Sequence, residues 1–223
     1  SFTRRFAVPR RNGGFPTQIL MPDTTGYLVV YYNPLGDRED GRIAPDRWVS
    51  WLDPSGEVIE DSLFTVEGKP GILSSESDFR MFLTVPFGKG PQFARGPAST
   101  VFYGRTDSLR VAQRSLEGTV LKTVRLPYTP IAVTREDADS VRAARNERAR
   151  KLLAQVDFPE YRPAFRELIT DDQDRVWIDV IDQPSSDSTT WKIVDLSAQE
   201  VVDTQLPEKV SIRYIRDGRV CGV

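Results

Sequence analysis

The chain has 223 residues, of which 39% are hydrophobic and 28% are charged, and these proportions are typical of a globular protein. The formal net charge of -2 argues against a nucleic acid partner, because binding phosphates requires a basic face. The sequence contains no histidine and one cysteine, which excludes Ser-His-Asp and Cys-His catalysis, histidine-ligated metal sites and an internal disulfide. No run approaches the roughly 18 apolar residues of a membrane span, so we predict at most a peripheral membrane contact.

Residues 1–16 read as an N-terminal arm that includes a short strand at residues 2–8. Arginines cluster in this arm, next to Pro9 and an Asn-Gly-Gly turn: Arg4, Arg5, Arg10 and Arg11. Two interpretations stay open, a solvated arm or a clamp on an acidic partner.

One pattern then occurs three times along the chain: a hydrophobic strand, a polar turn that usually contains glycine, and a second alternating strand. It covers residues 47–59, 108–121 and 190–202. Each copy is preceded by a further candidate hairpin, in residues 20–32, 96–104 and 171–180. The three combined units predict three β-propeller blades with four strands each.

Residues 210–223 start a fourth unit and stop halfway, with Asp217-Gly218 as the turn. About three blades plus partial ones are fewer than the 4 to 8 that close a ring. We therefore expect either a piece of a longer polypeptide or an open propeller whose edge strands are covered inside an assembly.

Residues 134–156 interrupt the β pattern and predict one inserted helix. Thr134 is the expected cap, acidic residues fill the first turn, and Pro159 ends the segment. The helix carries Arg142, Arg145 and Arg148. They are either solvated or part of a contact surface for a protein partner or anionic lipid headgroups.

Two segments carry a family resemblance. Residues 161–165 followed by 168–177, with the run Thr-Asp-Asp-Gln-Asp-Arg-Val-Trp, and residues 207–223 resemble bacterial secreted six-bladed β-propeller proteins, relatives of the NHL-repeat group. The resemblance extends from about Thr17 to the end and includes the inserted helix. It implies a mainly β, propeller-like fold of the six-bladed type with an incomplete ring, as one domain over residues 1–223, on the extracytoplasmic (periplasmic) side of a membrane.

Carboxylates are the only plentiful reactive groups. Asp171, Asp172 and Asp174 could offer oxygen ligands to calcium, but the same residues are what a tight turn between two strands requires. The glycines at residues 88–90 look like a plain loop and lack the sequence of a phosphate loop. The four tryptophans are assigned to packing between blades: Trp48, Trp51, Trp177 and Trp191.

These observations predict a non-enzymatic interaction protein without metal or cofactor, which docks to protein subunits of a larger bacterial membrane complex. One version suggested by the resemblance is an extrinsic subunit of a photosynthetic reaction centre with its antenna. The candidate partner-binding residues are Arg4, Arg5, Arg10, Arg11, Arg142, Arg145 and Arg148. The alternatives are a calcium-dependent lactonase-type propeller, or a small-molecule or glycan binder that would need aromatic residues such as Tyr27, Tyr31, Phe102 and Tyr103 at one mouth of the ring.

Overall fold

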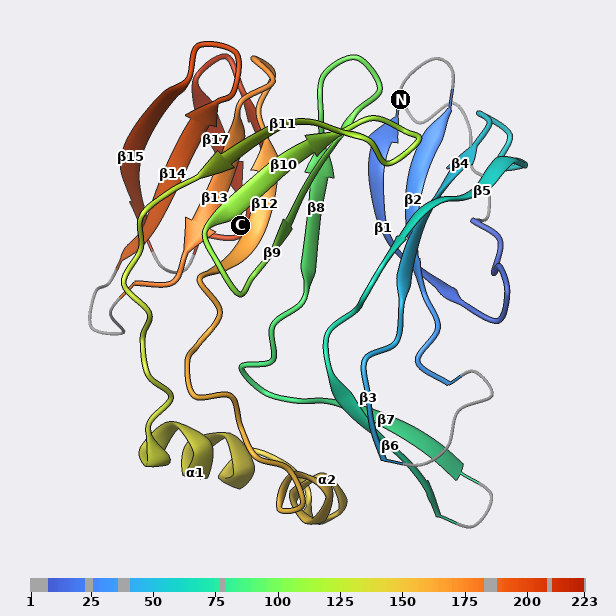
Figure 1. Ribbon diagram of the computed structural model, residues 1–223, viewed down its shortest axis with the longest axis vertical. Helices are drawn as coiled ribbons and strands as arrows, with labels where there is room; N and C mark the ends of the chain where they lie inside the picture. The colour runs from blue at the N-terminus through green and yellow to red at the C-terminus, as the bar shows by residue number, and fades with distance from the viewer. Residues whose placement is uncertain are drawn as a thin grey trace. The chain divides into compact units, whose positions relative to one another are not determined.

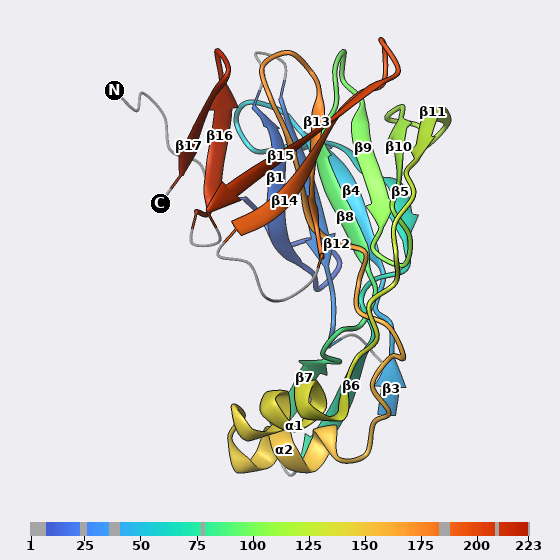
Figure 2. The ribbon, with the colours of Figure 1, turned by 90° about the vertical axis from the view of Figure 1, so that its left-hand side faces the viewer.

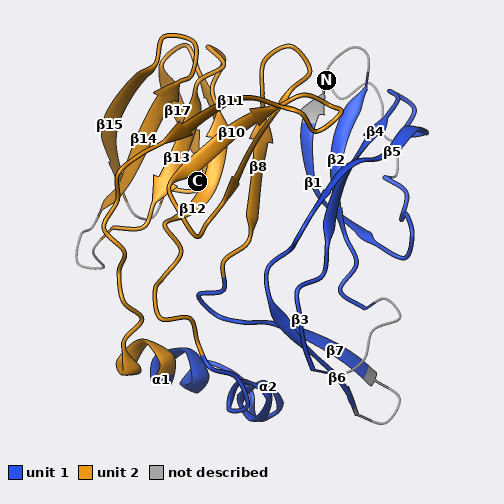
Figure 3. Cartoon of the chain, viewed as in Figure 1, with its two compact units in different colours: residues 1–88, 139–157 blue, residues 89–138, 158–223 orange. Residues whose placement is uncertain are grey.

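The computed structural model describes residues 8–22, 26–35, 41–76, 79–182, 188–207 and 210–222. It is mainly β with two short helices, as predicted (Figure 1). The chain divides into two compact units, unit 1 with residues 1–88 and 139–157 and unit 2 with residues 89–138 and 158–223 (Figure 3). The prediction of one domain over residues 1–223 stays a prediction.

Unit 1 contains a four-stranded antiparallel sheet in which neighbours along the chain are neighbours in space, apart from the inserted strand β3. Val29, Tyr31, Trp48 and Leu52 alternate along its two central strands and form a core on one face. The strands, in order across the sheet, are β1 (Phe15–Pro22), β2 (Tyr27–Tyr32), β4 (Arg47–Leu52) and β5 (Val58–Val66). Both hairpins predicted for this region are confirmed.

Unit 1 also has a small sheet that the sequence analysis did not predict. It consists of β3 (Gly41–Ile43), β6 (Gly71–Glu76) and β7 (Phe79–Thr84), in the order β3-β6-β7. Gly71 permits the close packing of β6 on β7, because a Cβ atom at this position would lie 2.1 Å from the ring of Phe82.

Unit 2 contains two four-stranded antiparallel sheets and a two-stranded hairpin. The first sheet has β8 (Pro91–Arg95), β9 (Val101–Arg105), β10 (Arg110–Arg114) and β11 (Val120–Arg125). The second has β12 (Phe165–Thr170), β13 (Val176–Val180), β14 (Ser188–Asp195) and β15 (Glu200–Pro207). The hairpin is β16 (Ile212–Arg216) with β17 (Arg219–Gly222), so all the hairpins predicted for this region are confirmed.

The sheets of unit 2 pack face to face because β13 buries both of its faces. Val176 and Ile178 point into a core shared with Phe102 and Val111 of the first sheet. Trp177 points the other way, into a core shared with the β16–β17 hairpin (Figure 2). The predicted packing role of the tryptophans is confirmed for Trp48, Trp177 and Trp191, which are buried, while Trp51 is half-buried.

The prediction of one helix over residues 134–156 is wrong, because the segment forms two helices, α1 (Arg135–Ala143) and α2 (Glu147–Leu153). The side chain of Asn146 accepts a hydrogen bond from the backbone N–H of Ala149, so it caps a new helix instead of continuing the first. The predicted start is confirmed: Thr134 and Asp137 exchange side-chain-to-backbone hydrogen bonds of 3.0 and 3.1 Å, as a capping box does.

Candidate interaction site

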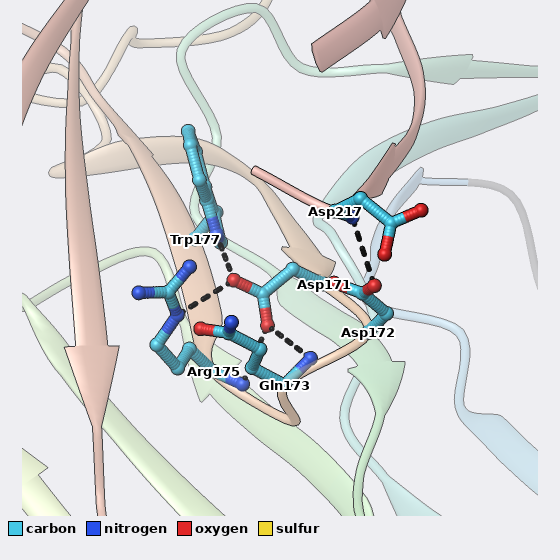
Figure 4. Close-up of polar contacts among 6 residues, drawn as sticks. All are labelled: Asp171, Asp172, Gln173, Arg175, Trp177 and Asp217. Atoms are coloured by element: carbon cyan, nitrogen blue, oxygen red, sulfur yellow. Dashed lines mark hydrogen bonds and ion pairs between the residues drawn. The ribbon is translucent and has the colours of Figure 1, made fainter. Parts of the chain in front are cut away.

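The aspartates considered as calcium ligands lie in the turn between β12 and β13, where Asp171 organises the hairpin (Figure 4). Its Oδ1 atom accepts hydrogen bonds from the backbone N–H groups of Gln173 and Arg175, at 3.0 and 2.9 Å. Its Oδ2 atom accepts from Arg175 Nε at 2.7 Å and from Trp177 Nε1 at 2.9 Å. This side chain has no exposed surface, and four donors from its own chain occupy its two oxygen atoms.

Asp172, the next residue in the turn, accepts a hydrogen bond of 2.9 Å from the backbone N–H of Asp217 (Figure 4). This bond ties the β12–β13 turn to the turn of the β16–β17 hairpin. Asp174 occupies the left-handed region with a φ of 60°. The three aspartates therefore serve the turn, and among the described residues no group of acidic or cysteine side chains has an arrangement that could hold a metal ion.

The arginines predicted to bind a partner are placed as follows where they are described; Arg4 and Arg5 lie outside the described residues. Arg10 stacks its guanidinium over the ring of Phe15, 4.5 Å from the centroid. Arg11 donates to the carboxylate of Asp61 at 3.4 Å, and the side chain of Asn12 donates to the same oxygen at 3.3 Å. The described part of the arm is thus attached to unit 1.

The other three predicted arginines lie in the helical segment. Arg142 in α1 forms an ion pair of 3.5 Å with Asp139, Arg145 is exposed between the two helices, and Arg148 in α2 is half-buried. The first turn of α1 is held by a shorter pair, with 2.6 Å between Arg162 and Asp137. Hydrogen bonds from Thr134 and Arg162 hold the pKa of Asp137 below its usual value.

A second acidic group lies on the face of the β12–β15 sheet that carries Trp177. Burial raises the pKa of Asp179 to about 6, although Arg166 Nε lies 3.0 Å from its Oδ2 atom. The Oδ1 atom of Asp179 is buried and has no hydrogen-bond partner among the described residues. Glu167 and Asp182 add to this field, and burial also raises the pKa of Glu167, whose other charged neighbour is Arg213.

The outer strands of the four-stranded sheets have a surface feature in common that was not singled out from the sequence. Each begins, directly after its turn, with two apolar residues, at least one of them strongly exposed. The most exposed are Ile59 on β5, Val120 and Leu121 on β11, and Val201 and Val202 on β15, with exposed fractions between 43% and 58%. In the sequence they belong to the three-fold repeated pattern, which could have located them.

Within unit 2, a groove of about 500 Å³ runs between β11 and the hairpin of β14 and β15. Its apolar lining comes from Val124, Leu196 and Val201, among others, and its basic lining from Lys122 and Arg125. Asp195 also lines it, and backbone N–H groups of Ala198 and Ser197 hold the pKa of this carboxyl below its usual value. β11 is the terminal strand of its sheet, so its outer backbone groups border the groove without a neighbouring strand of that sheet.

Two other predictions are decided by burial. Tyr31 and Phe102 are core residues with 0% and 1% exposure, so they are not available at the mouth of a ring for glycan binding. Residues 88–90 form the predicted plain loop before β8, where the backbone N–H of Gly90 donates to Thr106 Oγ1 at 3.0 Å.

No family model matches the chain, and no curated protein matches it either. The resemblance to secreted six-bladed propellers therefore rests on the residues that carry it and stays a prediction. None of the helices formed by the described residues has both the length and the apolar character that crossing a membrane requires.

Proposed function

We propose that this chain is a non-enzymatic interaction protein built from β-propeller-like blades, and that it docks through the free edge of β11. The occupant is an extended segment of a protein partner, which adds as a further strand and places acidic side chains over Lys122 and Arg125. Strand addition of this kind uses main-chain hydrogen bonds for affinity and side-chain pockets for specificity.

The single observation that carries the proposal is the combination of a terminal strand with an apolar and basic groove beside it. All residues of β11 except Val124 are exposed, and Val120 and Leu121 leave about half of their surface in solvent. Isolated exposed apolar residues are ordinary, but adjacent pairs bordering a groove are typical of interaction surfaces. Lys122 also reaches Leu196 O across the groove, at 3.4 Å, so its charge is held at this surface.

The blade-like architecture has its own support. Three antiparallel sheets have four strands in sequential order, and in unit 2 successive sheets pack face to face through two separate cores. The engagement of Asp171 and Asp172 in protein hydrogen bonds supports a structural role for the acidic turn. The finer proposals, a six-bladed ring, an extracytoplasmic location and a bacterial membrane complex such as a photosynthetic reaction centre, follow from the resemblance alone.

The test is native mass spectrometry of the protein purified from its own membranes in mild detergent. We expect a complex of fixed stoichiometry that is lost in the double variant Leu121→Lys and Val202→Lys, because two ammonium groups cannot be buried against a partner strand. The matched control is Tyr214→Lys, which changes an equally exposed side chain on β16. A wild-type chain found only as an isolated monomer would overturn the proposal, as would a folded double variant that keeps the complex.

A further inference from the structure

A second cavity of unit 2 lies over the β9–β10 hairpin and has a volume of about 330 Å³. Its lining residues come from β9, β10, the turn between them and the first residue of β11. They are Tyr103, Gly104, Arg105, Asp107, Ser108, Arg110, Ala112, Arg114 and Val120. None of the predicted partner-binding arginines is among them, and the docking groove is lined by other residues.

The strand register explains why a hollow forms here. Alternate residues Arg110, Ala112 and Arg114 of β10 lie on one face, so a small side chain is flanked by two long ones. Ala112 is paired with Tyr103 and Arg110 with Arg105 on β9. Ala112 thus forms the floor, and the longer side chains form the walls.

The same register brings like charges together. Arg105 lies directly opposite Arg110, and Arg110 lies directly opposite Arg125 on β11, so three neighbouring strands carry arginine at one level. Like charges in directly opposed positions destabilise a sheet. Asp107 is the one acidic residue of the cavity lining, and it already pairs with Arg105 Nε at 3.2 Å. Two positive charges of the cavity therefore have no acidic counterpart in its lining.

The polar groups around these charges are suited to an oxyanion. The guanidinium of Arg114 lies over the ring of Tyr103, 4.6 Å from the centroid, which fixes both side chains. Burial raises the pKa of Tyr103, so its hydroxyl is protonated at neutral pH and can donate a hydrogen bond. Guanidinium groups bind phosphate-type oxyanions with paired, charge-assisted hydrogen bonds.

We propose that this cavity binds a small molecule through a dianionic phosphate or sulfate group, held by Arg105, Arg110 and Arg114. The surplus of two positive charges matches one dianion. The volume exceeds what a few water molecules fill, so it also accommodates a small organic group attached to the anion.

The test is isothermal titration calorimetry of the full chain with inorganic phosphate, sulfate and glycerol 3-phosphate, at constant ionic strength set with chloride. We expect saturable binding with one site. Arg114→Gln should weaken it about tenfold, the contribution of one charge-assisted hydrogen bond. Ala112→Leu should abolish it by filling the floor while leaving the charge unchanged.

Arg95→Gln is the matched control, because Arg95 is exposed at the end of β8 in the same sheet and does not line the cavity. Its affinity for phosphate should stay within about twofold of wild type, and circular dichroism should show that all variants are folded. Absence of saturable binding, or equal affinity in a folded Ala112→Leu variant, would overturn the proposal.

Two further arms separate the sources of the anion. Succinate carries two negative charges without a tetrahedral group, and equal affinity for it would refute the phosphate or sulfate class. Vesicles containing phosphatidic acid present the same phosphate chemistry on a surface. If the vesicles bind and soluble glycerol 3-phosphate does not, the small-molecule proposal fails.

Discussion

Two turns of the molecule have nearly the same local structure and very different surroundings. Asp53 Oδ1, at the start of the β4–β5 turn, accepts hydrogen bonds from the backbone N–H groups of Ser55 and Glu57. Asp171 Oδ1 accepts from the groups two and four residues further on in the same way. Asp53 is open to solvent, whereas Asp171 is buried and also binds Arg175 and Trp177. One local motif therefore serves as a surface turn in one sheet and as a buried link in another.

The largest expected effect comes from removing the buried carboxylate. Asp171→Ala leaves two backbone N–H groups and the indole N–H of Trp177 without their acceptor, so we expect a loss of about 3 kcal/mol in the free energy of unfolding. For a chain of this length that lowers the Tm by about 10 °C, measurable by calorimetry.

Asp53→Ala is the matched control for this substitution, because it removes the same local hydrogen bonds where water can replace them. It should destabilise the protein clearly less. Asp171→Asn should fall between the two alanine variants, since the amide keeps one acceptor oxygen and turns its NH₂ group toward donors. Equal effects of Asp53→Ala and Asp171→Ala would show that burial of the second oxygen contributes nothing.

Asp179 sharpens the comparison, because it is a buried carboxylate of the same sheet whose oxygens are incompletely paired. Its pKa of about 6 means that the folded protein keeps a proton that the unfolded chain releases near pH 4. Between these values the folded state binds more protons, so its stability falls as the pH rises. We expect Asp179→Asn to remove this decline and to stabilise the protein at pH 7 by about 2 kcal/mol.

The measurement is urea unfolding at pH 4, 5, 6 and 7, with Arg166, Glu167, Asp182 and Arg213 left intact. Near pH 4 the two proteins should have nearly equal stability, which provides an internal control. If the wild type is the more stable protein at pH 7, the pair of Asp179 with Arg166 outweighs the cost of burial and the expectation is wrong.

The smallest effect concerns the fourth position of the two turns. Gly56 has a φ of 93° and Asp174 a φ of 60°, so both positions require the left-handed region. Gly56→Ala should destabilise the protein by about 1 kcal/mol, because a Cβ atom is disfavoured there. Asp174→Gly should change the stability by less than that, because relief of strain is offset by the greater freedom of glycine in the unfolded chain. Thermal unfolding of both variants checks this, and a large loss in Asp174→Gly would indicate a role for the Asp174 side chain.

The hairpins could be predicted from the sequence because their information is local. Alternating strands on either side of Asp53, Gly118 or Asp217-Gly218 predicted pairings that the strand registers confirm. The small sheet of β3, β6 and β7 was missed because its short strands come from distant segments, and none of them has a paired neighbour that is signalled by a tight turn at both ends. The break between α1 and α2 was missed because Asn146 was read as part of a helix instead of as a cap.

The sequence by itself determined the repeated turns and strands of this protein, because the hydrogen bonds that form them join residues two to four positions apart. Only the tertiary structure decided which of these turns is buried, because the burial of Asp171 depends on the face-to-face packing that encloses Trp177. The cavity over Ala112 has the same origin. Its arginines lie five or fewer positions apart in the sequence, but only the pairing of β9 with β10 places Arg105 opposite Arg110 and leaves a hollow between long side chains.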